Sequence, residues 1–463
     1  MSPSTSRRTS RSTSAVIWLR RDLRVRDNPA LLAALDEGSV TALFVIDPAI
    51  WAGAGAARRA WLAANVLSLA ERIPLTIHHG APSDVVPRVA GERRVHVAAE
   101  TTPYGRRRDE EVGQKVDLVA TGSPYALDPG LVRNGSGDPY QVFTPFARAW
   151  RARGWPRPAP TPRSPDLVPA DSDERAVGVL ERALAEAPFD LPPAGEDAAW
   201  QRWHDFRRDS LAGYAAHRNR PDHDGTSRLS PYLHLGVIHP RSMLADIDPR
   251  SAYADELAWR EFYADVLWRS PKSAWTDLKP ALAGMTYDEP GDAIEAWRTG
   301  TTGFPIVDAG MRQLLRTGWM HNRVRMITAS FLTKDLHVWW PVGARHFMDL
   351  LIDGDVASNN HGWQWVAGTG TDASPYFRVF NPISQGLTFD PQGDYVRRWV
   401  PELEHLPGAS AHEPWKSAVG YQHDYPLRIV DHAAERREAL GRYRAARASS
   451  SAYRPSRLGA DLI

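Results

Sequence analysis

Four side chains that can hold a planar, polar ligand recur at helical spacing in residues 256–263, which read ELAWREFY. In a helix, Glu256, Trp259, Arg260 and Tyr263 fall on adjoining parts of one face. A carboxylate beside an aromatic plate can hydrogen-bond one edge of a nucleobase while the ring stacks on the base. The alternative is an ordinary amphipathic helix with its tryptophan in the core and its charges in solvent.

A second helical segment, GWMHNRVRM over residues 318–326, aligns an amide with a cation and a thioether. The helical period places Asn322 in line with Arg325 and Met326. An asparagine side chain can recognise a paired carbonyl and N–H edge, but it equally serves as a local cap or a surface residue.

Residues 351–382 gather aspartate, asparagine, tryptophan and glycine in the run LIDGDVASNNHGWQWVAGTGTDASPYFRVFNP. Asp353 and Asp355 have no regularly spaced histidine beside them, and the sequence DGD also occurs in plain turns, so we expect no metal site. An interior aspartate needs a positive partner, and Arg325 is a candidate.

A phosphate-binding candidate is the segment DGTSRLSPYLHLG, residues 224–236. Hydroxyls and backbone N–H groups there precede a helix whose expected cap is Ser230 and whose expected first residue is Pro231. A capped helix without a ligand has the same pattern. The first expected strand is followed by RRDLRVRDNPAL, which lacks G-x-G-x-x-G, so an ordinary NAD-dependent oxidoreductase is disfavoured.

The elements that would position these residues form two domains, as a length of 463 residues favours. Short apolar runs alternate with helical patterns such as 58–73 and predict an α/β domain with a doubly wound parallel sheet over 15–150. The expected strands are 16–20, 41–47, 75–79, 94–100 and 117–121. A proline-rich stretch predicts an interdomain linker over 151–199, and helical periodicity predicts an all-α domain over 200–445.

Composition limits the remaining classes. Residues 1–14 predict a disordered basic tail, and residues 446–463 a C-terminal tail. The absence of cysteine excludes disulfides, thiolate metal sites and cysteine nucleophiles. No apolar run is long enough to cross a bilayer and no secretory signal is present, so we expect a cytoplasmic protein that does not enter membranes. With a net charge of +1, any nucleic-acid surface must be a local patch.

Taken together and in this order, the motifs closely resemble the photolyase and cryptochrome family, specifically its class I cyclobutane pyrimidine dimer photolyases. The resemblance runs from Val16 to about Leu440. It rests on WLRRDLRVRDNPAL, VFTPFARAW, DGTSRLSPYLHLG, ELAWREFY, TGFPIVDAGMRQL, TGWMHNRVRMITASFLTKDL and the segment 351–382. It implies an α/β domain for an antenna pigment, a helical domain that holds a U-shaped FAD, and light-driven repair of pyrimidine dimers in DNA.

The resemblance also assigns residues around the flavin. The positions that match the surroundings of its phosphates are Tyr214, Thr226, Ser227, Arg228, Leu229 and Ser230. The positions that match the isoalloxazine and ribose region are Asp353, Gly354 and Asp355, with Arg325 as the partner of Asp353 and Asn359 facing flavin N5. An amide suits N5 because it can accept the N5–H of reduced flavin, where a carboxylate would repel the anion.

For the substrate, the resemblance implies a pocket for a dimer flipped out of the DNA. The matching positions are Glu256 and Asn322 for hydrogen bonds to the dimer, Met326 beside it, Trp259 and Trp365 as aromatic walls, and Arg218 and Arg323 at the DNA backbone. In the family mechanism, photoexcited and fully reduced flavin gives one electron to the dimer, the cyclobutane ring opens, and the electron returns. Protein groups position the dimer and stabilise its radical anion.

Two positions depart from the family pattern. Trp363 and Trp340 match the first two tryptophans of the chain that photoreduces oxidised flavin. The family's third tryptophan lies ten residues before the tryptophan of the AW..G segment, and ten residues before Trp297 this chain has Tyr287. Either Tyr287 is the donor there, or it is a surface residue and another tryptophan completes the chain. His361 replaces a usual glycine, which predicts altered backbone or polarity near the flavin.

The main rival function is a cryptochrome, a photoreceptor that keeps FAD and signals without repair; a second rival is a flavin-bound DNA-binding module. Asn322 with Met326, and the intact WQW, favour dimer repair. The segment TTPYGRRRDEEV, residues 101–112, resembles members that use 8-hydroxy-5-deazaflavin more than those that use methenyltetrahydrofolate. The alternative is that this segment is simply the start of a helix that binds no pigment. We expect a monomer whose partner is DNA that contains cyclobutane pyrimidine dimers.

Overall fold

The computed structural model describes residues 15–279, 282, 284–371 and 377–452. Its N-terminal part contains a five-stranded parallel sheet with the strand order β3-β2-β1-β4-β5. The strands are β1 (Ala15–Leu19), β2 (Val40–Ile46), β3 (Leu75–His79), β4 (Arg94–Val97) and β5 (Leu118–Ala120). The predicted doubly wound α/β domain is therefore confirmed. The strand order reverses between β1 and β4, which makes this pair the topological switch point of the sheet.

Helices cover both faces of the sheet because successive strand residues point to opposite sides. In β1, Ile17 and Leu19 join a core with residues of α1 and α3, while Val16 and Trp18 join a core with residues of α4. The helices of this part are α1 (Pro29–Leu35), α2 (Pro48–Ala52), α3 (Ala56–Arg72), α4 (Pro82–Ala90), α5 (Pro103–Gly113) and α6 (Phe143–Arg153).

The segment 151–199, expected as a linker, contains regular structure. Helix α7 (Glu174–Ala185) buries Ala176 and Leu180 in the same core as α3. Helix α8 (Glu196–Asp209) starts at Glu196, whose carboxylate accepts hydrogen bonds from the backbone N–H groups of Val25 and Arg26 at 3.0 and 2.9 Å. The chain thus returns to the sheet domain before it enters the second domain.

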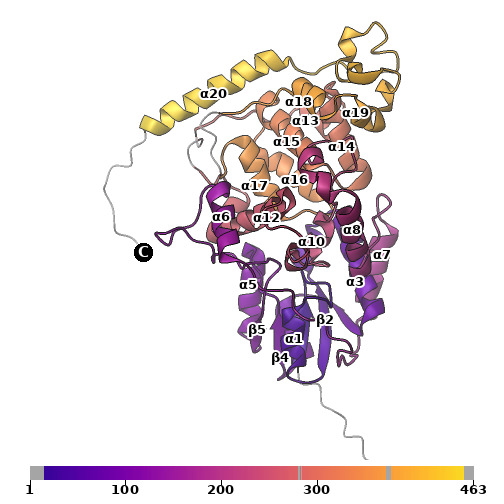
Figure 1. Cartoon of the computed structure of the whole chain (residues 1–463), viewed down its shortest axis with the longest axis vertical. Helices are drawn as coiled ribbons and strands as arrows, with labels where there is room; N and C mark the ends of the chain where they lie inside the picture. The colour runs from indigo at the N-terminus through magenta and orange to yellow at the C-terminus, as the bar shows by residue number, and fades with distance from the viewer. Residues whose placement is uncertain (1–14, 280–281, 283, 372–376, 453–463) are drawn as a thin grey trace, which may run out of the picture.

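The second domain is helical, as predicted, and lies at the opposite end of the molecule from the sheet (Figure 1). Its α-helices are α9 (Tyr214–His217), α10 (Ser230–Leu235), α11 (Pro240–Leu244), α12 (Ala252–Arg269), α13 (Asp292–Thr299), α14 (Pro305–Thr317), α15 (Asn322–Ser330), α16 (Trp340–Leu350), α17 (Val356–Ala367), α18 (Pro382–Phe389), α19 (Asp394–Trp399) and α20 (His432–Ala452). Short 3-10 or π turns are η1 (Leu211–Gly213), η2 (Pro271–Ala274), η4 (Phe331–Asp335), η5 (Pro401–Leu403), η6 (Gly408–His412) and η7 (Pro414–Lys416).

Helix α20 crosses the outer side of this domain (Figure 1) and continues past residue 445 into the expected tail, with Ala446 buried. Among the residues that the structure describes, no helix is both long enough and apolar enough to span a membrane.

Candidate functional site

A pocket of about 550 Å³ lies in the helical domain, a volume typical of cofactor and substrate sites. It brings together most of the residues that the sequence singled out. These are Tyr214, Arg218, Thr226, Ser227, Arg228, Leu229, Ser230, Glu256, Trp259, Asn322, Arg323, Arg325, Met326, Asp353, Asp355, Asn359, Trp363 and Trp365. They come from α9, α10, α12, α15, α17 and the turns before them, so the pocket exists only once these helices have packed.

Helix α12 turns one predicted face to the pocket. Glu256, Trp259, Arg260 and Tyr263 all line it, as helical spacing required. The Trp259 ring stacks on Phe143 of α6, with ring centroids 3.7 Å apart and an angle of 7° between the planes. This stacking fixes the tryptophan while leaving part of it to the pocket.

Glu256 forms an ion pair inside the pocket with Arg218, whose Nη2 lies 2.7 Å from Oε1. The geometry is not that of a linear hydrogen bond, and Oε1 is buried without a hydrogen-bond partner among the described residues. Burial raises the pKa of the Glu256 carboxyl, Arg218 lowers it in part, and the net direction is upward. The carboxyl therefore has an unused hydrogen-bonding position and protonates more readily than an exposed glutamate.

Asp353 is held by two donors from distant parts of the chain. Arg325 Nη2 donates to its Oδ2 at 2.8 Å, and the Ser230 hydroxyl donates to the same oxygen at 2.6 Å. The ion pair expected between Arg325 and Asp353 is therefore present. Oδ1 of Asp353 is buried and has no partner among the described residues, although it belongs to a residue that lines the pocket. That oxygen can accept a hydrogen bond from a bound N–H group.

Asp355 begins helix α17. Its Oδ1 accepts a hydrogen bond from the backbone N–H of Ser358 at 2.9 Å, and its Oδ2 accepts one from Arg21 of the sheet domain at 2.6 Å. Burial raises the pKa of this carboxyl, but Arg21 and His234 outweigh burial and bring the pKa well below its ordinary value. Asp355 is thus an anion at the N-terminus of α17, where the helix dipole favours negative charge.

One turn into α17, Asn359 is oriented by both hydrogens of its amide. Its Nδ2 donates to the backbone carbonyl of Ala344 at 3.1 Å and to Oδ1 of Asn360 at 2.8 Å. The two bonds leave the Asn359 carbonyl oxygen as the acceptor that the residue presents in the pocket lining.

The segment before α10 supplies hydroxyls and backbone to the same pocket. Arg228 has a positive φ of 51°, uncommon for a residue with a side chain, and its guanidinium lies 4.9 Å from the Trp319 ring. Helix α10 begins at Ser230, its N-cap is Leu229, and it has no side-chain cap. The expectation that Ser230 caps this helix was wrong, because its hydroxyl bonds to Asp353, 123 residues away.

Three predicted residues do not line the pocket. Trp340 is fully buried beside it, and its indole N–H donates to Asp277 at 2.7 Å. Tyr287 packs in a separate apolar cluster beneath α20. Gly354 lies under the pocket wall, where an added Cβ would come 2.7 Å from a guanidinium nitrogen of Arg58.

His361 faces away from the pocket, although its neighbours on α17 line it. Its ring is fully buried, bonds to the Ala357 carbonyl at 2.8 Å and contacts the Ser273 hydroxyl at 2.9 Å. The ring also stacks near Tyr263 at 5.9 Å between centroids. Burial lowers the pKa of His361 to about 4. Its influence therefore reaches the pocket through the packing of Tyr263, not by direct contact.

Sequence reasoning missed several lining residues. Among them are Trp319, Asn219, His234 and Tyr253. Trp319 belongs to the segment 318–326 that the sequence had singled out, and its aromatic ring could have indicated a place in the pocket lining. No spacing could have indicated Arg21, because its contact with Asp355 crosses 334 positions of the chain.

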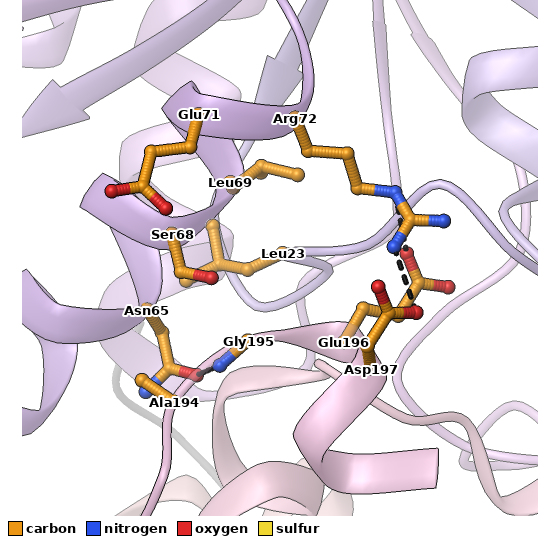
Figure 2. A pocket seen from close by; sticks show the side chains of 10 residues that line it. All are labelled: Leu23, Asn65, Ser68, Leu69, Glu71, Arg72, Ala194, Gly195, Glu196 and Asp197. Atoms are coloured by element: carbon orange, nitrogen blue, oxygen red, sulfur yellow. Dashed lines mark hydrogen bonds and ion pairs between the residues drawn. The ribbon is translucent and has the colours of Figure 1, made fainter. Parts of the chain in front are cut away.

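A smaller pocket of about 210 Å³ lies between α3 and the start of α8 (Figure 2). Two polar side chains of α3 that line it bond to residues at the start of α8: Asn65 Oδ1 accepts the Gly195 N–H at 3.0 Å, and Arg72 Nη1 lies 3.0 Å from Asp197. These contacts fasten the second domain to the first, so this pocket is a structural junction.

The chemistry of the main pocket suits a flavin dinucleotide. Hydroxyls and backbone groups of residues 226–230 can meet phosphates, while Asp353 Oδ1 and the Asn359 carbonyl can accept ring N–H groups. Over the described residues, no three histidine, aspartate or glutamate side chains cluster in a way that could hold a metal ion.

Fold and site together define a two-domain protein in which an α/β domain docks on a helical domain, and the helical domain carries a pocket lined by aromatic, acidic and arginine side chains. Residues 15–166 match the family model described as DNA photolyase, and residues 253–445 match the FAD binding domain of DNA photolyase. The chain belongs to the photolyase and cryptochrome family.

Individual relatives agree with this placement over nearly the whole chain. The deoxyribodipyrimidine photo-lyase of Salmonella typhimurium is 40% identical, over 93% of this chain and 98% of its own. A bacterial class III photolyase from Agrobacterium tumefaciens superimposes with a TM-score of 0.86 at 34% identity, covering 96% of this chain and 100% of its own. A Synechocystis cryptochrome superimposes with a TM-score of 0.84 at 28% identity, covering 92% and 98%.

Proposed function

We propose that this chain is a deoxyribodipyrimidine photo-lyase, an enzyme that uses light and FAD to split cyclobutane pyrimidine dimers in DNA. The observation that carries the proposal is that the residues assigned to the dimer and, except for Gly354, those assigned to the flavin line a single pocket. Curated relatives that bear this enzyme's name at 40% identity support repair over a purely signalling role.

Within the pocket, the flavin would be held by residues 226–230 at the start of α10, by Arg325 of α15, and by Asp353, Asp355 and Asn359 before and within α17. Asp353, which is ion-paired with Arg325, would accept a ring N–H, and Asn359 would face N5 with its carbonyl oxygen. When bound in its fully reduced form, FAD supplies a light-absorbing one-electron donor. The protein contributes placement and a fixed polar environment.

A second set of residues that line the pocket would bind the dimer. Trp259 and Trp365 stack on it, Met326 lies beside it, and Glu256 and Asn322 bond its polar edges. Flipping a damaged dinucleotide out of the duplex costs a few kcal/mol, and stacking returns roughly 1–3 kcal/mol per base. Lesions that already pair poorly are therefore selected in part by their own weakness.

The proposal is tested by loading the purified chain with FAD, reducing it chemically, and illuminating a dimer-containing oligonucleotide with blue light. Restoration of intact thymines that requires light, reduced flavin and protein together supports it. Tight binding of damaged DNA without any repair would overturn it and favour the cryptochrome function.

We also propose that the α/β domain binds an antenna chromophore, and we favour 8-hydroxy-5-deazaflavin over methenyltetrahydrofolate. The segment that suggested it starts α5, where Thr102 caps the helix and the Tyr104 hydroxyl donates to Asp47 at 2.6 Å. This arrangement places an oriented aromatic ring near the end of β2. The absorption spectrum of the purified protein distinguishes the two pigments from each other and from FAD alone.

Finally, we propose that the enzyme acts as a monomer in the cytoplasm, where one pocket per chain meets its DNA. Sedimentation of the FAD-loaded protein, alone and with a damaged duplex, tests the stoichiometry.

A further inference from the structure

Arg21 occupies a special place in the sheet. It lies two residues after the last residue of β1, and Glu100 lies three residues after the last residue of the neighbouring strand β4, so both stand just beyond the carboxyl ends of the strands that form the switch point. In open α/β sheets this crevice is where ligands bind. Here the helical domain occupies it, with α10 close to the end of the sheet (Figure 1).

The guanidinium of Arg21 reaches from the sheet domain to two residues that line the main pocket, Asp355 and His234. Its Nη2 donates to Asp355 Oδ2 at 2.6 Å, its Nε donates to the carbonyl of His234 in α10 at 3.1 Å, and its Nη1 lies 3.7 Å from Glu100. The side chains of Arg21 and Asp355 are 15% and 10% exposed. Because both charges are largely buried, removing one of them destabilises the other far more than it would in an exposed surface pair.

The two backbones also meet at this point, so Arg21 has little freedom to move. The carbonyl oxygen of Arg21 would lie 1.9 Å from a Cβ placed on Gly236, which has a left-handed φ of 64°. Nearby, the Leu23 N–H donates to the Leu235 carbonyl at 3.3 Å, and Arg24 donates to the Gly236 carbonyl at 2.9 Å. Only glycine allows this approach.

We propose that Arg21 is an interdomain positioning residue for the flavin pocket: it holds Asp355, and through it the start of α17, at the place that the cofactor needs. The inference rests on the proposed function, because it takes FAD as the occupant of the pocket. Asp355 uses one oxygen for Arg21 and the other to cap α17, and Asn359 lies on the first turn of that helix. A shift of Asp355 therefore moves Asn359.

The charge state of Asp355 makes this role measurable. The groups that act on it most strongly are Arg21 after β1, His234 on α10 at 3.9 Å, and Arg260 on α12, and Tyr125 and His361 also interact with it electrostatically. Tyr125 and Glu100 lie beside Arg21, and Arg58 lies near His234. Burial raises the pKa of Asp355, and Arg21 is the largest opposing influence. Without Arg21 the carboxyl protonates at higher pH and becomes a weaker cap.

The test is FAD binding against pH, measured by fluorescence titration of the apo-protein, with circular dichroism to verify folding. The parent chain is expected to bind FAD with a flat profile between pH 5.5 and 8.5. Arg21→Gln is expected to weaken binding roughly 10- to 100-fold, by analogy with residues that orient metal ligands, and to lose further affinity as the pH falls. Asp355→Asn has no titrating carboxyl, so adding Arg21→Gln to it should leave the profile flat.

Arg20 provides the matched control. It precedes Arg21, but its guanidinium stays in the sheet domain, where it pairs with Asp109 at 2.7 Å and lies 4.4 Å from the Trp18 ring. Arg20→Gln should lower the melting temperature without giving FAD binding a pH dependence. Arg21→Lys keeps the charge and should restore the flat profile at intermediate affinity. If Arg21→Gln does not fold, the comparison of Arg21→Lys with Arg20→Lys replaces it, and only the former should lose affinity.

FAD binding by Arg21→Gln equal to the parent at every pH, or the same pH dependence in Arg20→Gln, would overturn the inference. Failure of the proposed function is recognised separately. In that case the parent chain itself binds no FAD, and the inference falls with the function on which it rests.

Discussion

Arg218 and Glu256 are paired inside the pocket, with Nη2 and Oε1 2.7 Å apart and the two side chains 30% and 28% exposed. The residue proposed to touch the DNA backbone thus partly neutralises the residue proposed to touch the lesion. If Arg218 turns to a phosphate of bound DNA, Glu256 is released to bond the dimer, so we expect backbone binding and lesion recognition to be coupled through this pair.

Replacing Glu256 by alanine is expected to lower the repair yield more than it lowers flavin occupancy. The proposed hydrogen bond stabilises charge that develops on the dimer, and a hydrogen bond to a charged group contributes about 1.5–3 kcal/mol. Repair per absorbed photon and the flavin-to-protein ratio are measured on the same sample. Equal losses of both quantities would make Glu256 a structural residue.

Replacing Arg218 by glutamine is expected to move the pH dependence of lesion binding upward. Burial raises the pKa of Glu256 and Arg218 opposes that rise, so removing the guanidinium lets the pKa rise further. Glu256 then becomes neutral at a higher pH than in the parent. Affinity for a dimer-containing duplex against pH checks the shift, and an undamaged duplex is the control. An unchanged midpoint would separate Glu256 from lesion binding.

Removing one partner of the ion pair between Arg325 and Asp353 is expected to lower the free energy of unfolding strongly. Arg325→Ala leaves the carboxylate of Asp353, with a side chain only 2% exposed, to the Ser230 hydroxyl alone. Such a change costs about 3–5 kcal/mol. Urea unfolding of the apo-protein measures it. Adding Asp353→Asn should recover part of the loss, and no recovery would assign the effect to the packing of Arg325.

Much of the fold could be predicted because its signals are local. The strand runs of the sheet alternate with helical patterns, and the five strands formed within a few residues of the predicted bounds. The face of α12 followed from the helical period alone, since Glu256 and Trp259 are three residues apart. The run 174–185 was read as linker because prolines flank it, although its own periodicity is helical.

The site divides in the same way. Residues such as Asn322 and Asp353 were found because long motifs resembled a known family, not because their spacing proved a role. Contacts between distant segments had no local signal in the sequence. The Ser230 hydroxyl donates to Asp353 instead of capping its own helix, and Arg21 donates to Asp355 across the domain boundary. Such pairings depend on tertiary packing, which no single segment encodes.

Burial of His361 is expected to cause part of the loss of folding stability at acidic pH. Burial lowers its pKa to about 4 in the folded chain, against about 6.5 when unfolded. The unfolded chain therefore takes up a proton first as the pH falls, and stability is lost between pH 6.5 and 4, by roughly 3 kcal/mol at most. His361→Gln should remove this share, so its unfolding midpoint should fall less steeply over that range. Parallel slopes for parent and variant would contradict the assignment.

The last prediction concerns the outer end of the route by which oxidised flavin is photoreduced. Trp339 is 37% exposed, and its ring centroid lies 6.4 Å from that of Trp340. Tyr287 is instead packed in an apolar cluster, where burial and the nearby Asp277 raise its pKa. Oxidation of a tyrosine requires loss of its phenolic proton, which this setting resists, whereas a tryptophan can first form a cation.

We therefore expect Trp339→Phe to impair photoreduction more than Tyr287→Phe, and Trp340→Phe to impair it whichever residue is terminal. Transient absorption of the FAD-loaded variants follows the tryptophan and tyrosine radicals separately. A tyrosyl signal that disappears in Tyr287→Phe, together with unchanged kinetics in Trp339→Phe, would assign the terminal position to Tyr287. Repair by flavin that has already been reduced chemically should survive all three substitutions, because the electron that splits the dimer comes from the flavin and returns to it. Loss of repair in a variant under those conditions would mean that the substitution had disturbed the pocket itself.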